Sequence, residues 1–109
     1  MEKVIRIDGQ DVRFGMTAAL PLYYAKYFGS DVYRDALTMG ADQGANTTLM
    51  FRMIWTMAFQ ADKSIKPLEQ WIEGFNSFPI YKVFNELSDM FWMSITGPAG
   101  KTDPARVSC

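Results

Sequence analysis

The segment LYYAKYFGSDVYRD, residues Leu22–Asp35, decides the fold because it contains two short helical stretches joined at Gly29. Glycine often follows the last residue of a helix. Ser30 then predicts the N-cap of the next helix, and Asp31 suits its positively polarised first turn. The first half carries four large aromatic side chains, Tyr23, Tyr24, Tyr27 and Phe28. These would bury large areas while the tyrosine hydroxyls require polar partners, so the segment indicates an anchor and a binding function.

The residues before this segment predict a β-hairpin. Residues 3–7 and 12–14 are strand-like, and Asp8-Gly9 between them is a strong signal for a two-residue turn. An isolated hairpin is marginally stable in water, so its apolar face must lie on helices or on the sheet of another subunit. The turn sets Ile5 opposite Val12 and Lys3 opposite Phe14. The apolar face consists of Ile5, Ile7, Val12 and Phe14.

Capping signals predict three helices between the hairpin and residue 60. The first begins near Pro21, because the first amides of a helix have no acceptor within the helix. The second ends near Gly40, and Asn46 or Thr47 caps the third. This third helix contains Leu49–Gln60, LMFRMIWTMAFQ, the most apolar segment of the chain.

Two prolines predict the starts of the last two helices. Pro67 and Pro79 each stand at the beginning of a segment with apolar residues at helical spacing. The first segment carries Leu68, Trp71, Ile72 and Phe75, and the second carries Ile80, Val83, Phe84, Leu87, Phe91 and Ile95. We therefore expect a mainly α protein (α+β): a short N-terminal β-hairpin and about five helices in a small bundle. Residues 1–96 form the single domain, and residues 97–109 form a disordered, flexible polar tail.

The third helix carries one narrow polar stripe along an otherwise apolar surface. Arg52, Thr56 and Gln60 form this stripe at i, i+4 and i+8. A helix that is apolar on all its other sides must be surrounded by protein over most of its circumference. In a domain of this size, that requires either a central position or an interface in an oligomer.

Composition limits the classes of function. The chain has 109 residues with a hydrophobic content of 49%, which favours a folded domain over a disordered segment. Its 11 basic and 12 acidic residues leave a net charge of −1 without a basic run, so we expect no nucleic-acid partner. No apolar run approaches the length of a bilayer span, and the N-terminus lacks the pattern of a signal peptide. The chain has a single cysteine, Cys109, which agrees with a reducing cytoplasmic setting.

The residue types that usually perform catalysis are missing or unassembled. The chain has no histidine, which removes the commonest general base and most metal-ligand sets, so we expect no enzyme and no cofactor. Carboxylates do occur at helical spacing, but such pairs are ordinary on solvated helix surfaces. They are Asp31 with Asp35, Glu69 with Glu73, and Glu86 with Asp89.

Two apolar stripes are candidates for a partner surface. Met50, Met53 and Met57 lie at i, i+3 and i+7, and flexible methionine side chains suit surfaces that accept varied partners. The alternative is that these methionines fill gaps in the core. On the last helix, Tyr81, Asn85, Ser88 and Trp92 form a second stripe, which Met93 widens. The alternative for Trp92 is that it covers the hairpin.

Three blocks of the chain give it a family resemblance: VIRIDGQDVRF, then LYYAKYFGSDVYRD, then AFQADKSIKPLEQWIEGF. The third includes Ala61-Asp62, Pro67, Trp71 and Phe75. With these blocks the chain resembles the tail assembly chaperones encoded by long-tailed phages and prophages of Gram-positive bacteria.

The resemblance implies a small, mainly helical assembly factor without catalytic residues. Such proteins bind the tape-measure protein, keep it soluble and help tail-tube subunits assemble around it. They act in the host bacterial cytoplasm and are absent from the mature virion. The resemblance and the surplus of apolar helix surface together favour a homo-oligomer. Members often exist in a short form and a longer form made by ribosomal frameshifting.

Two other classes of function compete with this interpretation. The first is a virion-structural head–tail connector or tail-completion protein, which would remain in the particle. The second is a small nucleic-acid-binding regulator, which the near-neutral charge and the lack of a basic helix oppose.

Overall fold

The N-terminal hairpin has the predicted strands and register. This computed structural model describes residues 2–41 and 46–96, without the side chains of 94–96. Strand β1 (Glu2–Ile7) pairs antiparallel with strand β2 (Gln10–Gly15). Asp8 and Gly9 both have positive φ, 53° and 76°, as a two-residue turn of type I′ requires. Three of the four side chains of the predicted apolar face are buried, and Val12 is partly buried. The face packs on α3.

Helices α1 (Leu20–Phe28) and α2 (Val32–Ala41) are separated at Gly29, as predicted. Gly29 has φ 63°, and its N–H donates to the Ala25 carbonyl at 2.8 Å, which ends α1. The predicted N-cap of α2 is wrong by one residue. Asp31 is the cap, because its Oδ1 accepts from the backbone N–H of Tyr33 and Arg34, at 2.7 and 3.2 Å.

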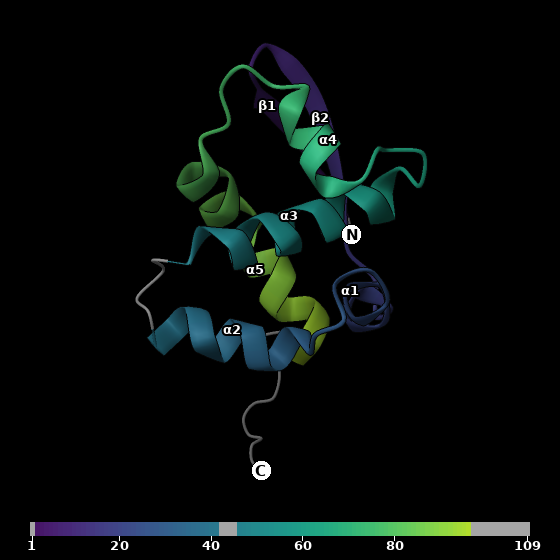
Figure 1. Ribbon diagram of the computed structural model, residues 1–109, viewed down its shortest axis with the longest axis vertical. Helices are drawn as coiled ribbons and strands as arrows, with labels where there is room; N and C mark the ends of the chain where they lie inside the picture. The colour runs from purple at the N-terminus through teal and green to yellow at the C-terminus, as the bar shows by residue number, and fades with distance from the viewer. Residues whose placement is uncertain (1, 42–45, 97–109) are drawn as a thin grey trace.

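Helix α3 (Thr47–Ala61) occupies the centre of the molecule. Asn46 is its N-cap and accepts from the Leu49 N–H at 3.2 Å. Strand β2 and the other four helices all contact α3, and Figure 1 shows it crossing the middle of the molecule in front of α5. Of the two alternatives for this apolar helix, the described structure therefore has the central position. At its C-terminal end, Gly15 approaches so closely that a Cβ there would lie 3.2 Å from the Ala61 nitrogen.

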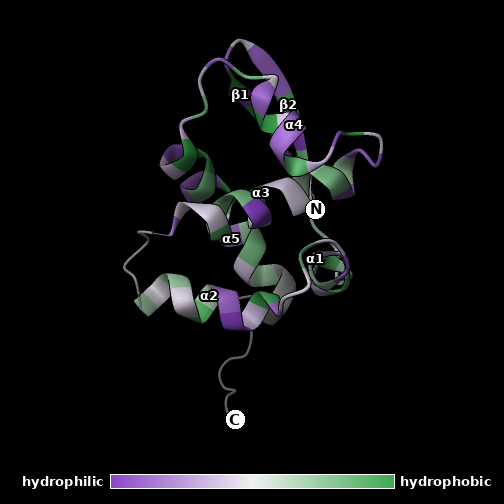
Figure 2. Cartoon of the chain, in the orientation of Figure 1, coloured by the Kyte–Doolittle hydropathy of each residue, from purple (hydrophilic) through white to green (hydrophobic). Residues whose placement is uncertain are grey.

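Helices α4 (Leu68–Glu73) and α5 (Ile80–Thr96) begin directly after Pro67 and Pro79. The stripe of α5 enters the core through Val83, Phe84, Leu87 and Phe91, with Met90 beside them. Figure 2 shows hydrophobic and hydrophilic segments alternating along α2, as in an amphipathic helix that covers a core. The fold prediction, a hairpin followed by five helices, is confirmed. The predicted tail, residues 97–109, and Ile95 as a core side chain lie outside the described residues.

Candidate functional site

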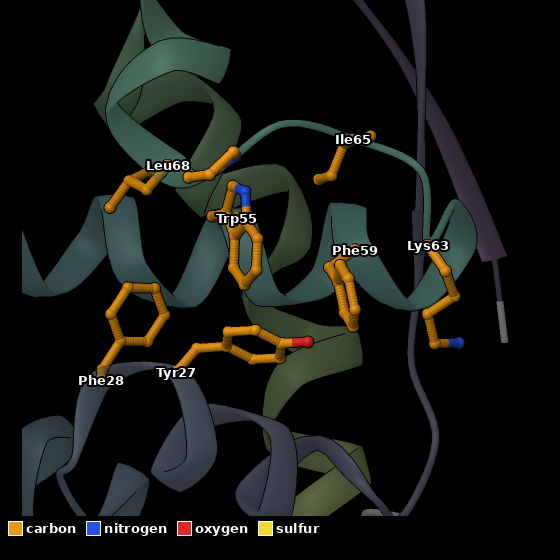
Figure 3. Close-up of a pocket in the computed structure, with 8 residues that line it drawn as sticks. Tyr27, Phe28, Trp55, Phe59, Lys63, Ile65 and Leu68 are labelled. Atoms are coloured by element: carbon orange, nitrogen blue, oxygen red, sulfur yellow. The ribbon is translucent and has the colours of Figure 1, made fainter.

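An aromatic groove made of two hollows lies along α3. The first, of about 340 Å³, lies between Tyr27 and Phe28 of α1 and the connection from α3 to α4. The second, of about 570 Å³, continues it between α3 and α4. Both hollows are lined by Phe28 and Leu68, so they lie next to each other, and we treat them together as the aromatic groove. Figure 3 shows the first hollow, with the rings of Tyr27 and Phe28 directed toward Trp55.

The spacing of aromatic residues on α3 builds the floor of this groove. Phe51, Trp55 and Phe59 lie at i, i+4 and i+8, so they share one side of the helix. The Trp55 and Phe59 rings stack with centres 5.0 Å apart. Tyr27 contacts both edge-on, at 5.3 Å from Trp55 and 5.1 Å from Phe59. Such interlocked rings hold the shape of the floor, and the half-exposed Tyr27 ring is the one that a ligand can reach.

A hydrogen bond joins the floor to the opposite wall. Trp55 Nε1 donates to the carbonyl oxygen of Lys66 at 2.8 Å, which holds the connection between α3 and α4 against the helix. Trp55 is only 4% exposed, so it shapes the groove from below, whereas Tyr27 is 46% exposed at the rim. A ligand would therefore meet the rim first, without any need for Trp55 to move.

Charged side chains differ between the two hollows. Lys63 lines the first, with its Nζ 5.3 Å from the centre of the Tyr23 ring and 5.7 Å from that of Phe59. The second is lined by Arg52, together with Glu69 and Glu73 of α4. The first hollow thus carries one basic group, whereas the second carries one basic group and two carboxylates. This arrangement favours one direction for a charged, elongated ligand.

A buried polar network fixes α1, which carries one wall of the groove. The Tyr24 hydroxyl donates to Asp35 Oδ2 at 2.7 Å, and the Ser30 hydroxyl donates to Asp35 Oδ1 at 3.0 Å. Burial, followed by the hydrogen bond and the charge of Asp35, raises the pKa of Tyr24 above its ordinary 10.0, while Arg52 acts in the opposite direction. Tyr24 therefore remains a neutral donor around neutral pH and joins α1 to α2.

The structure corrects the expected methionine surface on α3. Met50, Met53 and Met57 are buried, the last two completely, so they offer no exposed stripe to a partner. The reason is the central position of α3, whose methionine side faces other elements of the same chain. The alternative considered from the sequence, that these methionines fill the core, describes their placement.

The predicted residues of α5 do lie near the surface but do not form a groove. Tyr81 is 53% exposed and Trp92 is 44% exposed. Met93 is half-buried and lines a shallow hollow beside β1 together with Met90. Met90 and Met93, not Trp92, therefore lie next to the hairpin at this hollow. None of the six predicted binding residues lines the aromatic groove.

The sequence interpretation missed Phe51, Phe59 and Leu68 as site residues. The signal for the two phenylalanines was the repeat of aromatic residues at every fourth position of the third helix, one residue before the polar stripe. That stripe faces α1: the Arg52 guanidinium lies 5.5 Å from the centre of the Phe28 ring, and the Gln60 amide hydrogen-bonds Thr17 Oγ1 at 2.8 Å. On the aromatic side of α3, Trp55 and Phe59 are buried and Phe51 is partly exposed.

Within residues 2–41 and 46–96, no group of three or more acidic, histidine or cysteine side chains is arranged to hold a metal ion. No helix in this part of the chain is both long enough and apolar enough to span a bilayer. Comparison of the chain with protein-family models, curated proteins and solved structures gives no match.

Proposed function

We propose that this protein is a non-catalytic assembly chaperone that binds an amphipathic helical segment of a client protein in the aromatic groove. The client expected from the family resemblance is the tape-measure protein of a long-tailed phage. The observation that carries the proposal is the groove itself, which runs along α3 and has aromatic rings on its floor and rim. Its lining comes largely from two of the resembling blocks, including Tyr27, Phe28, Phe59 and Leu68.

The dimensions and chemistry of the groove suit a helix. From Phe51 to Phe59 the floor extends about 12 Å at 1.5 Å per residue, which matches roughly two turns of a docked helix. A helix with apolar residues at i, i+3, i+4 and i+7 would place them against the rings. The first hollow carries Lys63, and the second carries two carboxylates against the single Arg52, so the net charges differ in sign and would select the direction of a client with complementary charges.

The proposal also includes the setting in which the protein acts. A tape-measure protein is long and helical with apolar stripes, so several chaperone molecules would cover it, and self-association would help them do so. We propose action in the host bacterial cytoplasm, assistance to tail-tube subunits and absence from the mature virion. Binding requires no cofactor, because it depends on apolar contact and charge alone.

Co-expression tests the function. The tape-measure protein of the same phage or prophage, produced with this chain, should remain soluble and co-purify with it. A tape-measure protein that stays insoluble under these conditions would refute the proposal. Detection of the chain in purified mature virions by mass spectrometry would instead support a structural connector or tail-completion protein.

A matched pair of tyrosine variants tests the groove. Tyr27→Ser removes a half-exposed ring from the rim, whereas Tyr81→Ser removes a similarly exposed ring from α5, outside the groove. We expect Tyr27→Ser to weaken client binding by about tenfold or more, as is common for a central aromatic contact, and Tyr81→Ser to leave it unchanged. Both variants should keep the circular dichroism spectrum of the parent. The reverse pattern would place the client on α5 and refute the groove.

A further inference from the structure

The outer edge of β1 carries unpaired backbone groups. In a hairpin with a two-residue turn, Ile7 and Gln10 exchange hydrogen bonds, and such pairs recur at every second residue. Glu2, Val4 and Arg6 therefore direct their N–H and C=O groups away from β2. In the part of the chain that the structure describes, β2 is the only strand that pairs with β1.

Proteins usually protect such an edge, because an open strand is a template for pairing with another chain. Here the outer face of β1 has an exposed valine with opposite charges two residues away on each side. Val4 is 57% exposed, and the exposed side chains of Glu2 and Arg6 flank it. The pattern is self-complementary, because reversing the strand about Val4 exchanges the acid for the base.

We infer that β1 pairs antiparallel with β1 of a second copy of this chain, centred on Val4. Val4 then lies opposite Val4 of the second copy, and Glu2 lies opposite Arg6 of the second copy. Each of these pairs exchanges both N–H···O=C bonds, so every outward-facing backbone group of the three residues finds a partner. The two-stranded sheet of each copy becomes half of one continuous antiparallel sheet.

Charge complementarity selects this partner and this register. Opposite charges directly across an antiparallel pair are stabilising, and like charges are destabilising. Arg6 already contacts Asp11 on its β2 side, with Nη1 to Oδ1 at 3.0 Å, and a guanidinium has further N–H donors for a carboxylate on its other side. A shift by two residues would set Val4 against a charged side chain. A shift by one residue would mismatch the outward-facing backbone groups.

The inference does not rest on the proposed function. No residue of the hairpin lines the aromatic groove, so the edge and the groove are separate surfaces. A dimer through β1 would carry two grooves, whatever their ligand. The two proposals consequently fail in different experiments: client binding tests the groove, and the mass of the free chain tests the edge.

Measurement of molar mass by analytical ultracentrifugation, over a range of concentrations of the full chain, tests the edge. We expect a monomer–dimer equilibrium that Val4→Pro shifts toward monomer by about tenfold or more in dissociation constant, since proline removes an outward N–H without breaking the bonds to β2. Arg13→Pro is the matched control, because Arg13 lies opposite Val4 and its backbone N–H faces outward at the other edge of the hairpin. It should leave the dissociation constant unchanged.

Charge-reversal variants test the same strand pairing if a proline variant fails to fold. Glu2→Arg or Arg6→Glu alone should weaken the dimer, because each sets like charges opposite each other. The double variant restores opposite charges and should recover most of the affinity. A dimer that forms through a different surface would show no such recovery of affinity.

A disulfide reports the register directly. In a Cys109→Ser background, Val4→Cys sets two thiols in a pair whose Cα atoms lie about 5.5 Å apart, within the range of a disulfide. Mild oxidation should yield a covalent dimer. Asp11→Cys in the same background should not, because the two thiols would be about three strand spacings apart, roughly 14 Å or more. A chain that is monomeric at about 100 μM, or a dimer indifferent to Val4→Pro and to charge reversal, would overturn the inference.

Discussion

The Tyr24→Phe substitution removes one hydroxyl from the core and leaves the ring in place. Tyr24 is fully buried, and its hydroxyl donates to Asp35 Oδ2 at 2.7 Å. The ring also packs against Phe28, with centres 5.3 Å apart, and phenylalanine retains this contact. The variant therefore removes only the hydrogen bond to the buried Asp35 carboxylate. Among its described side-chain contacts, that carboxylate then keeps one donor, the Ser30 hydroxyl.

The expected cost is about 2 kcal/mol, since a hydrogen bond to a charged group contributes roughly 1.5–3 kcal/mol and its loss leaves a buried acceptor unsatisfied. For a domain of this size that lowers the melting temperature by about 10 °C. Urea unfolding followed by circular dichroism at pH 7 measures the free energy of unfolding. Tyr27→Phe is the control, because its ring is 46% exposed and its loss of a hydroxyl should change stability by less than about 0.5 kcal/mol.

The pH dependence gives a second, independent readout. The pKa of Tyr24 in the folded protein is raised above the ordinary 10.0, so above pH 10 the unfolded chain releases a proton that the folded chain retains. The stability that Tyr24 contributes is complete below pH 10 and is lost as the pH rises toward the higher folded pKa. The difference between parent and Tyr24→Phe should therefore shrink by about 1.4 kcal/mol between neutral pH and pH 11. A cost below about 0.5 kcal/mol at pH 7, or a difference that grows above pH 10, would refute this account.

Three further predictions concern helix ends and the core. Gly29→Ala should lower the free energy of unfolding by about 1 kcal/mol in urea titrations, because φ is 63° and open space around the site leaves backbone strain as the cost. Asp31→Ala should cost about 1 kcal/mol by loss of the α2 cap and should speed hydrogen exchange at the Tyr33 and Arg34 amides; unchanged exchange would contradict the cap. Met53→Ala should cost about 2–5 kcal/mol in thermal melts, because the side chain is fully buried; a near-neutral effect would mean that the methionine faces solvent.

Local signals predicted the backbone of this protein well. The Asp8-Gly9 turn accepts positive φ at both positions, and it therefore determined the strand register. Gly29 ended α1 for a similar reason, and Asn46 capped α3 through its own side chain. Each of these effects acts within a few residues, so the chain sequence contains all the information required. The N-cap of α2 was misplaced because Ser30 and Asp31 both suit a cap, and only the contact with Asp35 determines which one serves.

The sequence by itself determined the hairpin, the helices and the surplus of apolar side chains on Leu49–Gln60. Only the tertiary structure decided which side of that helix is core and which is groove, because every side of an almost wholly apolar helix is equally suited to burial. Packing of the other elements around α3 enclosed Met53 and Met57 completely and placed Phe51 and Phe59 along the two hollows, with Phe51 partly exposed. That choice depends on contacts between residues far apart in the chain, which periodicity along one helix does not specify.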